Sequence, residues 1–210
     1  MNQPFTDVIQ TEEELRTLLG FPSKTVQNKT ISYLDHNCME FISKSPFLML
    51  STADAEGNCD TSPRGDAPGF VHVLDQKHLV IPERPGNRRM DSLRNILSNK
   101  RVGLLFLIPG LEETLRINGE AWVVRDEEIL HKMQAFGKDP LLGIVVKVEE
   151  CFVHCAKAFK RSHLWQPDSW LSKETLPNMP KMLAEHVNLP DVDEESMVEL
   201  LEESYTKRLY

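Results

Sequence analysis

The sequence lacks several features that would place it in a well-marked class. Its longest apolar runs, residues 47–50 and 102–108, are far shorter than the roughly 20 residues that a helix needs to cross a bilayer. Residues 1–10 have no basic start followed by an apolar core, so we expect a cytoplasmic protein without a secretory signal or membrane span. No G-x-G-x-x-G, nucleophile-elbow or H-E-x-x-H motif is present, and the enzyme classes that these motifs identify find no support.

Positive charge and cysteine are also scarce. Lys and Arg number 24 against 32 Asp and Glu, a formal net charge of −8, which argues against a nucleic-acid partner and requires any anion site to be local. Cys38, Cys59, Cys151 and Cys155 contain no C-x-x-C pair, so we expect reduced thiols. His154 lies near two of them, but no second ligand pair accompanies it, and we predict no metal.

Helical patterns occur mainly outside the middle of the chain. Thr11 with Glu14 three residues later is a capping-box pattern, which predicts a short helix that stops at Gly20. A second helix before Pro46, with an apolar face, is predicted from five residues at helical spacing: Ile31, Leu34, Cys38, Phe41 and Ile42. Further helices are predicted at residues 87–97, 126–136 and 192–206.

The middle of the chain is dominated by strand patterns. Apolar runs bounded by turn-forming residues predict strands at 47–52, 70–74, 78–81, 102–107, 114–124 and 143–153, with a more polar strand around 61–64. Strands joined by short turns indicate an antiparallel barrel. We therefore predict a mainly β fold with peripheral helices: a barrel over residues 46–165, a helical segment at 1–45 packing on it, and a helical extension of the same domain at 166–210.

Residues 79–94 have the pattern of a phosphate site, because a strand leads through a Pro-Gly turn into a predicted helix. Free N–H groups at a helix start favour an anion, Arg88 and Arg89 could add charged donors, and Asn87 and Ser92 neutral ones. The alternative is that these arginines only solvate a helix face or pair with acids. Cations at a helix N-terminus oppose the macrodipole, however, and this favours a bound anion.

An upstream strand could reach the same ligand. Ser62 and Arg64 alternate along it, so their side chains point to one side of the sheet. The alternative is that Arg64 only forms an exposed pair with Asp66 at the following turn, where such pairs are common and weak.

A basic segment late in the chain interleaves cations with aromatic rings. Lys160 and Arg161 lie between Phe159 and Trp165, and together they could hold a planar heteroaromatic group with a phosphate tail. Both rings could equally fill the core.

The run from residue 79 to 106 resembles the phosphate-binding segment of the pyridoxamine 5'-phosphate oxidase-like superfamily, whose members bind flavin mononucleotide (FMN). A strand, a glycine turn, a polar residue with two cations, a helix and an Asn-x-Arg-Val strand entry occur in the same order. Here these are Ile81-Pro82-Glu83, Gly86, Asn87-Arg88-Arg89 and Asn99-Lys100-Arg101-Val102, and Asn118-Gly119-Glu120-Ala121 also matches. The resemblance covers residues 41–165, and residues 62–66 with 154–157 are similar to a bacterial subgroup of FMN-dependent proteins.

This resemblance implies an FMN-binding split barrel, with FMN bound between the two subunits of a homodimer. It gives Asn87, Arg88 and Arg89 a phosphate role. The full set of predicted cofactor-binding residues is Ser62, Arg64, Ile81, Pro82, Glu83, Asn87, Arg88, Arg89, Ser92, Lys160, Arg161 and Trp165, with Ile81, Pro82 and Glu83 along the flavin ring or ribityl chain. Residues 206–210 differ from the Phe-Trp-Gln-Gly-type ending of the oxidases, which argues against vitamin B6 oxidation.

The function predicted from the sequence is an FMN-dependent oxidoreductase for an unidentified small substrate, with NAD(P)H or a small organic molecule as electron donor. The flavin carries the redox chemistry, so no catalytic residue is assigned. Two alternatives remain: a protein that binds or carries flavin or haem without turnover, and a barrel that serves only for dimerisation.

Overall fold

The computed structural model describes residues 5–210, which fall into two compact units. The first ends at Thr30, and the second runs from Ile31 to Tyr210. The predicted boundaries after residues 45 and 165 stay predictions.

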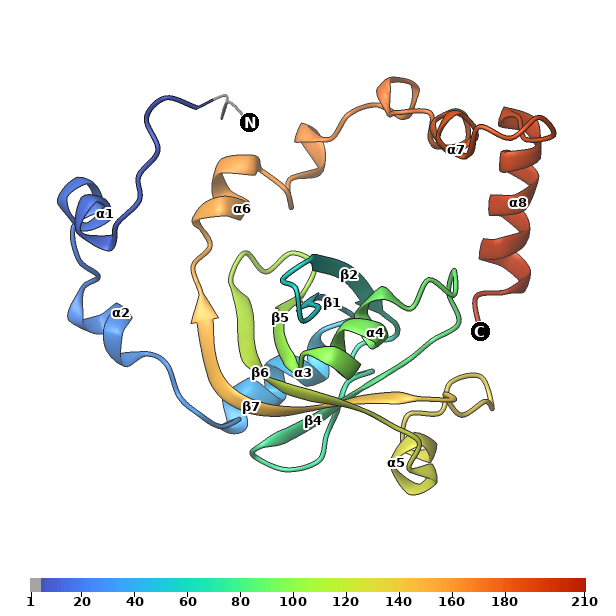
Figure 1. The fold of residues 1–210 in the computed structure, drawn as a ribbon. Helices are drawn as coiled ribbons and strands as arrows, with labels where there is room; N and C mark the ends of the chain where they lie inside the picture. The colour runs from blue at the N-terminus through green and yellow to red at the C-terminus, as the bar shows by residue number, and fades with distance from the viewer. Residues whose placement is uncertain (1–4) are drawn as a thin grey trace. The chain divides into compact units, whose positions relative to one another are not determined.

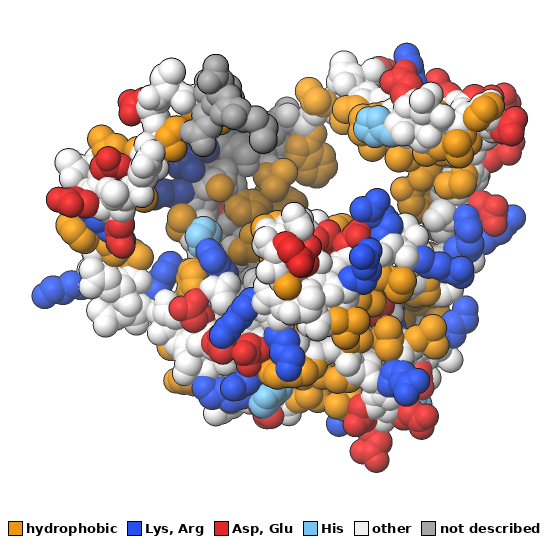
Figure 2. All heavy atoms as spheres, in the orientation of Figure 1, with side chains coloured by type: hydrophobic (Ala, Val, Ile, Leu, Met, Phe, Trp, Pro, Cys, Tyr) orange, Lys and Arg blue, Asp and Glu red, His pale blue; other side chains and the backbone are white. Residues whose placement is uncertain are grey.

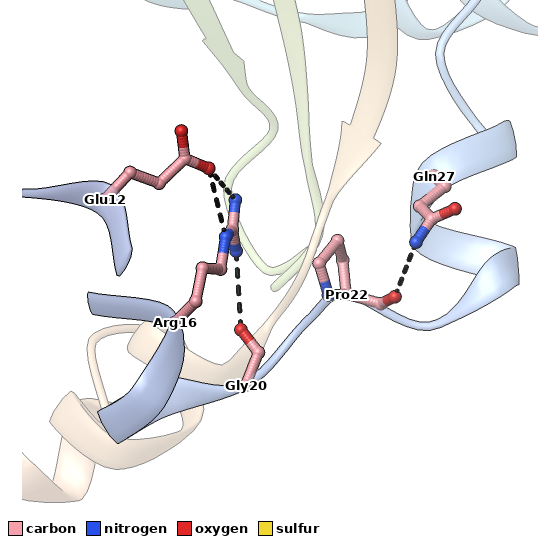
Figure 3. Close-up of polar contacts among 5 residues, drawn as sticks. All are labelled: Glu12, Arg16, Gly20, Pro22 and Gln27. Carbon is pink, nitrogen blue, oxygen red and sulfur yellow. Dashed lines mark hydrogen bonds and ion pairs between the residues drawn. The ribbon is translucent and has the colours of Figure 1, made fainter. Parts of the chain in front are cut away.

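The first unit contains two short helices. Helix α1 (Glu12–Leu19) begins at the predicted capping box and ends at Gly20, and α2 (Lys24–Asn28) follows. Figure 3 shows the local bonds around these helices: the Arg16 guanidinium donates to Glu12 Oε1, with Nη2 at 3.0 Å, and to the Gly20 carbonyl. Gln27 donates to the Pro22 carbonyl at 2.8 Å. These contacts join residues four or five positions apart, so they order the helices locally.

The second unit is built on a curved antiparallel sheet (Figure 1). Within the described residues the sheet has seven strands in the order β2-β1-β5-β6-β7-β4-β3. The strands are β1 (Phe47–Ala53), β2 (Cys59–Gly65), β3 (His72–Val73), β4 (His78–Pro82), β5 (Arg101–Leu107), β6 (Thr114–Val124) and β7 (Gly143–His154). All of their pairings are antiparallel. The predicted fold class, mainly β with peripheral helices, is confirmed.

Helices flank and follow this sheet. They are α3 (His36–Lys44), α4 (Asp91–Ser98), α5 (Glu127–His131), α6 (Lys157–Ser162), α7 (Met179–Val187) and α8 (Glu194–Lys207), with 3-10 turns η1 (Pro167–Ser169) and η2 (Lys173–Thr175). Helix α4 packs on β1, β2 and β6, while α7 and α8 pack on each other. No helix found in residues 5–210 combines the length and the apolar character that a membrane crossing requires.

The core fills the inner side of the sheet, and β1 and β5 contribute alternate residues to it. Leu48 and Leu50 of β1 and Leu104 and Phe106 of β5 are almost completely buried. These strands pair with Leu48 opposite Phe106 and Leu50 opposite Leu104, so each pair stacks on the same side.

The helix predicted from Ile31 begins later than expected. Helix α3 starts at His36, where the Asp35 side chain accepts the Cys38 N–H at 2.8 Å. Ile31 instead forms a β-bridge with Cys151. Leu34, Cys38 and Ile42 are buried in the core of the same chain. The apolar face predicted for this segment is therefore covered by the core of its own chain and gives no support to a homodimer.

Two other predicted elements are shorter in the structure. Helix α5 ends at His131 and not near Phe136, whose backbone has a left-handed φ of 49°. Strand β3 keeps only two of the five predicted residues, because Phe70 and Val71 turn into the core.

A bulge interrupts the pairing of the two longest strands. The register of β6 and β7 shifts between Asn118 and Gly119. A Cβ on Gly119 would lie 2.0 Å from the Lys147 carbonyl oxygen, which is far inside van der Waals contact. Glycine is therefore the residue that lets the two backbones approach at the bulge.

Candidate functional site

The predicted phosphate segment is an irregular loop followed by a helix. Residues 83–90, here named the β4–α4 loop, contain no helix or strand. Helix α4 begins at Asp91, so the prediction of a helix from Asn87 was wrong by about one turn. The reason is local: Arg88 and Met90 have φ values of 61° and 58°, and left-handed residues cannot continue a right-handed helix.

The two arginines of this loop have different surroundings. Arg89 Nε donates to Asp91 Oδ2 at 2.8 Å, and this bond raises the pKa of the Arg89 guanidinium. The Asn87 side-chain oxygen accepts the Arg89 N–H at 3.0 Å. Arg88 is exposed, and no hydrogen bond or ion pair joins its side chain to the rest of residues 5–210. Arg88 is thus the free cation of this loop among the described residues.

The start of α4 also has unused donors. Its N-cap residue, Met90, is left-handed, and no side chain caps the helix. The first N–H groups of a helix have no partner within the helix. In α4 they belong to the half-buried Asp91 and to the buried Ser92 and Leu93. Figure 2 shows basic side chains scattered among acidic and apolar ones and no single basic field, so an anion site on this face is local.

Ser62 and Ser92 are brought together by Asp60, which was not among the predicted site residues. Ser62 Oγ donates to Asp60 Oδ2 at 2.9 Å, and Ser92 Oγ donates to the same oxygen at 2.7 Å. Ser92 is 1% exposed, so this bond ties α4 to β2 in the interior. The alternation of side chains along a strand could have identified Asp60, because it lies two residues before Ser62 and therefore on the same half-buried side of β2.

Two ion pairs connect the ends of β2 and β4, which lie far apart in the strand order. Arg64 Nη1 contacts Glu83 Oε2 at 2.5 Å, and Arg84 Nε contacts Asp66 Oδ2 at 2.7 Å. Each strand end thus provides one arginine and one carboxylate, and we name this arrangement the crossed pairs. The exposed fractions of the four side chains lie between 5% and 24%. The alternative of an exposed Arg64–Asp66 pair is wrong, since each residue pairs across the sheet.

The crossed pairs are not fully satisfied. Arg64 Nε is buried and has no hydrogen-bond partner among the described residues. Burial raises the pKa of the Glu83 carboxyl more than the neighbouring Arg64 charge lowers it. A buried donor without a partner beside a partly desolvated carboxylate is the kind of place that a polar ligand atom can complete.

Ile81 and Pro82 offer a ligand only limited contact. Both are buried, and they pair with Ile144 and Gly143 of β7. A cofactor role for these two residues would have to use the backbone. Within residues 5–210, no group of three or more His, Cys, Asp or Glu side chains is placed to hold a metal.

The late basic and aromatic residues form a separate cluster. Lys160 pairs with Glu112, and Trp165 Nε1 donates to the Leu111 carbonyl at 2.9 Å, so both contact the turn between β5 and β6. The Trp165 ring stacks on the Phe159 ring, with 5.7 Å between the two ring centroids. In Figure 1, α6 and the β4–α4 loop lie apart. Arg161 is exposed on α6. The predicted site residues therefore form two clusters within one chain.

Comparison with known proteins identifies the family. A family model described as pyridoxamine 5'-phosphate oxidase matches residues 34–155. The chain belongs to the pyridoxamine 5'-phosphate oxidase family. The match includes the whole sheet and the β4–α4 loop, and the sequence-based assignment to this superfamily is confirmed. No curated protein matches the chain.

Several solved structures are similar to this chain. HupZ from Group A Streptococcus is 18% identical, with a TM-score of 0.47 over 57% of this chain and 92% of that chain. General Stress Protein 26 from Bacillus anthracis is 14% identical, with a TM-score of 0.42 over 54% of this chain and 88% of that one. HutZ, the heme storage protein from Vibrio cholerae, is 18% identical, with a TM-score of 0.41 over 58% of this chain and 93% of that chain.

Proposed function

We propose that this member of the pyridoxamine 5'-phosphate oxidase family binds FMN at the β4–α4 loop. In this proposal, a homodimer uses the flavin to transfer electrons between NAD(P)H or a small organic donor and an unidentified acceptor. When bound, the flavin supplies the redox chemistry, while the protein positions it and controls access to it. The observation that carries the proposal is the free Arg88 beside the uncapped start of α4.

The donors of this loop suit a phosphate group. A phosphate needs several N–H donors and positive charge, and Arg88 with the first turn of α4 offers both. The Arg89 guanidinium could also bind the phosphate if it exchanged its hydrogen bond to Asp91 for one to a phosphate oxygen. Ser62 and Ser92 suit the role less well, because both hydroxyl protons are used on Asp60.

The separation into two clusters supports a site shared between two chains. Trp165 and Lys160 contact the β5–β6 turn of their own chain, and Phe159 stacks on Trp165. A flavin needs both a stacking surface and a phosphate site, so the two clusters would act together if they came from different subunits. We therefore propose that the β4–α4 loop of one subunit and the cluster of Phe159, Lys160 and Trp165 from the other subunit surround one FMN.

Haem is the second candidate, and one feature favours it. His154 ends β7 as an exposed side chain just before the basic helix α6, where an imidazole with neighbouring cations could bind an iron porphyrin and its propionates. The absorption spectrum of the purified protein, with the released chromophore identified by mass, separates the two cofactors. A haem spectrum that is lost in His154→Ala would replace the flavin proposal.

Titration with FMN and riboflavin tests the phosphate site directly. Arg88→Ala removes one charged donor, worth about 1.5–3 kcal/mol, so FMN affinity should fall by roughly one to two orders of magnitude. Riboflavin has no phosphate and should bind the variant and the wild type equally. Arg125→Ala, at an exposed arginine after β6, is the matched control and should leave both affinities unchanged. Equal FMN affinity in Arg88→Ala and wild type would refute the assignment.

A separate experiment distinguishes an enzyme from a carrier. Rapid mixing of the FMN-loaded protein with NADH or NADPH should bleach the flavin absorption within the turnover time. A loaded protein that no reduced nicotinamide and no small organic donor reduces would be a flavin-binding protein without redox turnover.

A further inference from the structure

Tyr210 reaches the crossed pairs from a distant part of the chain. It lies three residues beyond α8, and its hydroxyl donates to Asp66 Oδ1 at 2.8 Å. The ring centroid lies 4.4 Å from that of Phe136, and the carbonyl accepts a hydrogen bond from Lys138 Nζ at 3.2 Å. Three different groups of one residue are therefore engaged, which fixes both its position and its orientation.

Asp66 depends on this hydroxyl. Its side chain is 5% exposed, so its carboxylate must find donors within the protein. Oδ2 accepts from Arg84, whereas Oδ1 accepts from the Ala67 N–H at 2.7 Å and from Tyr210. Tyr210 is thus the side-chain donor that holds the second oxygen and keeps the carboxylate plane turned towards Arg84.

Arg84 in turn fixes the start of the β4–α4 loop. Its Nε binds Asp66, and its Nη2 donates to the Met133 carbonyl at 2.9 Å. Glu83, the preceding residue, is held by Arg64 and by its N–H bond to the Leu142 carbonyl at 3.0 Å. Beyond Arg84 the loop has fewer anchors until the Arg89–Asp91 bond, so its geometry depends on these first two residues.

We propose that Tyr210 is a positioning residue for the β4–α4 loop, acting through Asp66 and Arg84 to hold the loop in its anion-binding geometry. That this geometry serves FMN rests on the function proposed above. The role differs from contact with the ligand, because Tyr210 bonds to Asp66 and not to Arg88 or the start of α4.

Tyr210→Phe is the test variant, because it removes the hydroxyl and keeps the ring against Phe136. Tyr205→Phe is the control, since Tyr205 lies on α8 and is 65% exposed. Hydrogen–deuterium exchange of peptides covering residues 83–90 reports the loop without any ligand. We expect faster exchange in Tyr210→Phe and wild-type exchange in Tyr205→Phe, with circular dichroism confirming that both variants are folded.

FMN and riboflavin titrations connect the loop to binding. Tyr210→Phe should raise the Kd for FMN about fivefold or more, the usual range for coupling between linked sites, and should change the riboflavin Kd less. A purely structural defect would weaken both ligands alike, and that result would overturn the positioning role. Unchanged exchange over residues 83–90 would also overturn it, whatever the protein binds. Altered exchange in a protein whose wild type binds no FMN would support the positioning role and refute the proposed function.

Discussion

Replacing Asp66 by asparagine tests whether the crossed pairs stabilise the barrel. The substitution keeps the size and shape of the side chain but removes its charge. In the wild type, burial raises the pKa of Asp66, but bonds from Tyr210, the Ala67 N–H and Arg84 outweigh burial and bring the pKa below its usual value. The folded structure therefore favours the charged form of Asp66, and neutralising it must cost free energy of unfolding.

The expected magnitude follows from the contacts that remain. Removing one partner of a buried ion pair costs about 3–5 kcal/mol. The asparagine side chain would retain an oxygen that can accept a hydrogen bond, and Arg84 would keep its bond to the Met133 carbonyl. We therefore expect a somewhat smaller loss, about 2–4 kcal/mol. For a unit of this size, each kcal/mol lowers Tm by about 2–4 °C, so Tm should fall by roughly 5–15 °C.

Urea unfolding followed by tryptophan fluorescence measures this loss. Asp75→Asn is the control, because the Asp75 side chain is 57% exposed and its contact with His78 is a surface pair, so this substitution should cost much less stability than Asp66→Asn. A carboxyl group whose pKa is lowered by folding stabilises the folded protein at pH values above its pKa in the unfolded chain, about 3.9. This contribution is lost as the pH falls through the pKa that the group has in the folded protein. The gap between wild type and Asp66→Asn should therefore close on acidification below about pH 4. A cost no larger than that of Asp75→Asn at pH 7, or a gap independent of pH, would refute the reasoning.

Three further predictions concern other parts of the chain. Gly119→Ala should destabilise by about 2–3 kcal/mol or more, because its Cβ would overlap backbone, whereas Gly86→Ala, in open space, should be nearly neutral by the same urea titration. In the native state a thiol reagent should modify the exposed Cys59 and Cys155 within minutes and the two core thiols only after unfolding; four equal rates would contradict the burial. Trp165→Phe should change the fluorescence of bound flavin, and an unchanged signal would return Trp165 to a packing role.

The strands of this fold were predictable because their signals are local. The pattern from Thr114 to Val124 predicts β6 with the bounds that the structure has, since alternate burial along a strand repeats every two residues. Helix α3 was harder, because Ile31 and Leu34 fit a helical period by chance while their burial comes from β7 and the core. Tertiary packing overrode the periodicity at these two positions.

The sequence indicated some residues of the candidate site but not their arrangement. The sequence pattern placed Arg88 at the start of the predicted helix. Nothing in the sequence marks Arg88 and Met90 as left-handed, a conformation that few non-glycine residues favour. The crossed pairs connect residues 18 or 19 positions apart on strands that are not neighbours, so only the curvature of the sheet brings them together. Tyr210, 144 positions from Asp66, was beyond any local pattern.

The two outermost strands have a consequence for self-association. The unpaired backbone of an edge strand is a template for another chain, and proteins protect such edges with short strands, charges and proline. Here one edge is β3, with only two residues, and the other is β2, which contains Pro63, a residue without an N–H to donate, between Asp60 and Arg64. Neither edge presents a long, uninterrupted row of donors and acceptors. Two copies of this chain should therefore meet through side chains of loops, helices and sheet faces, and not by adding strand to strand.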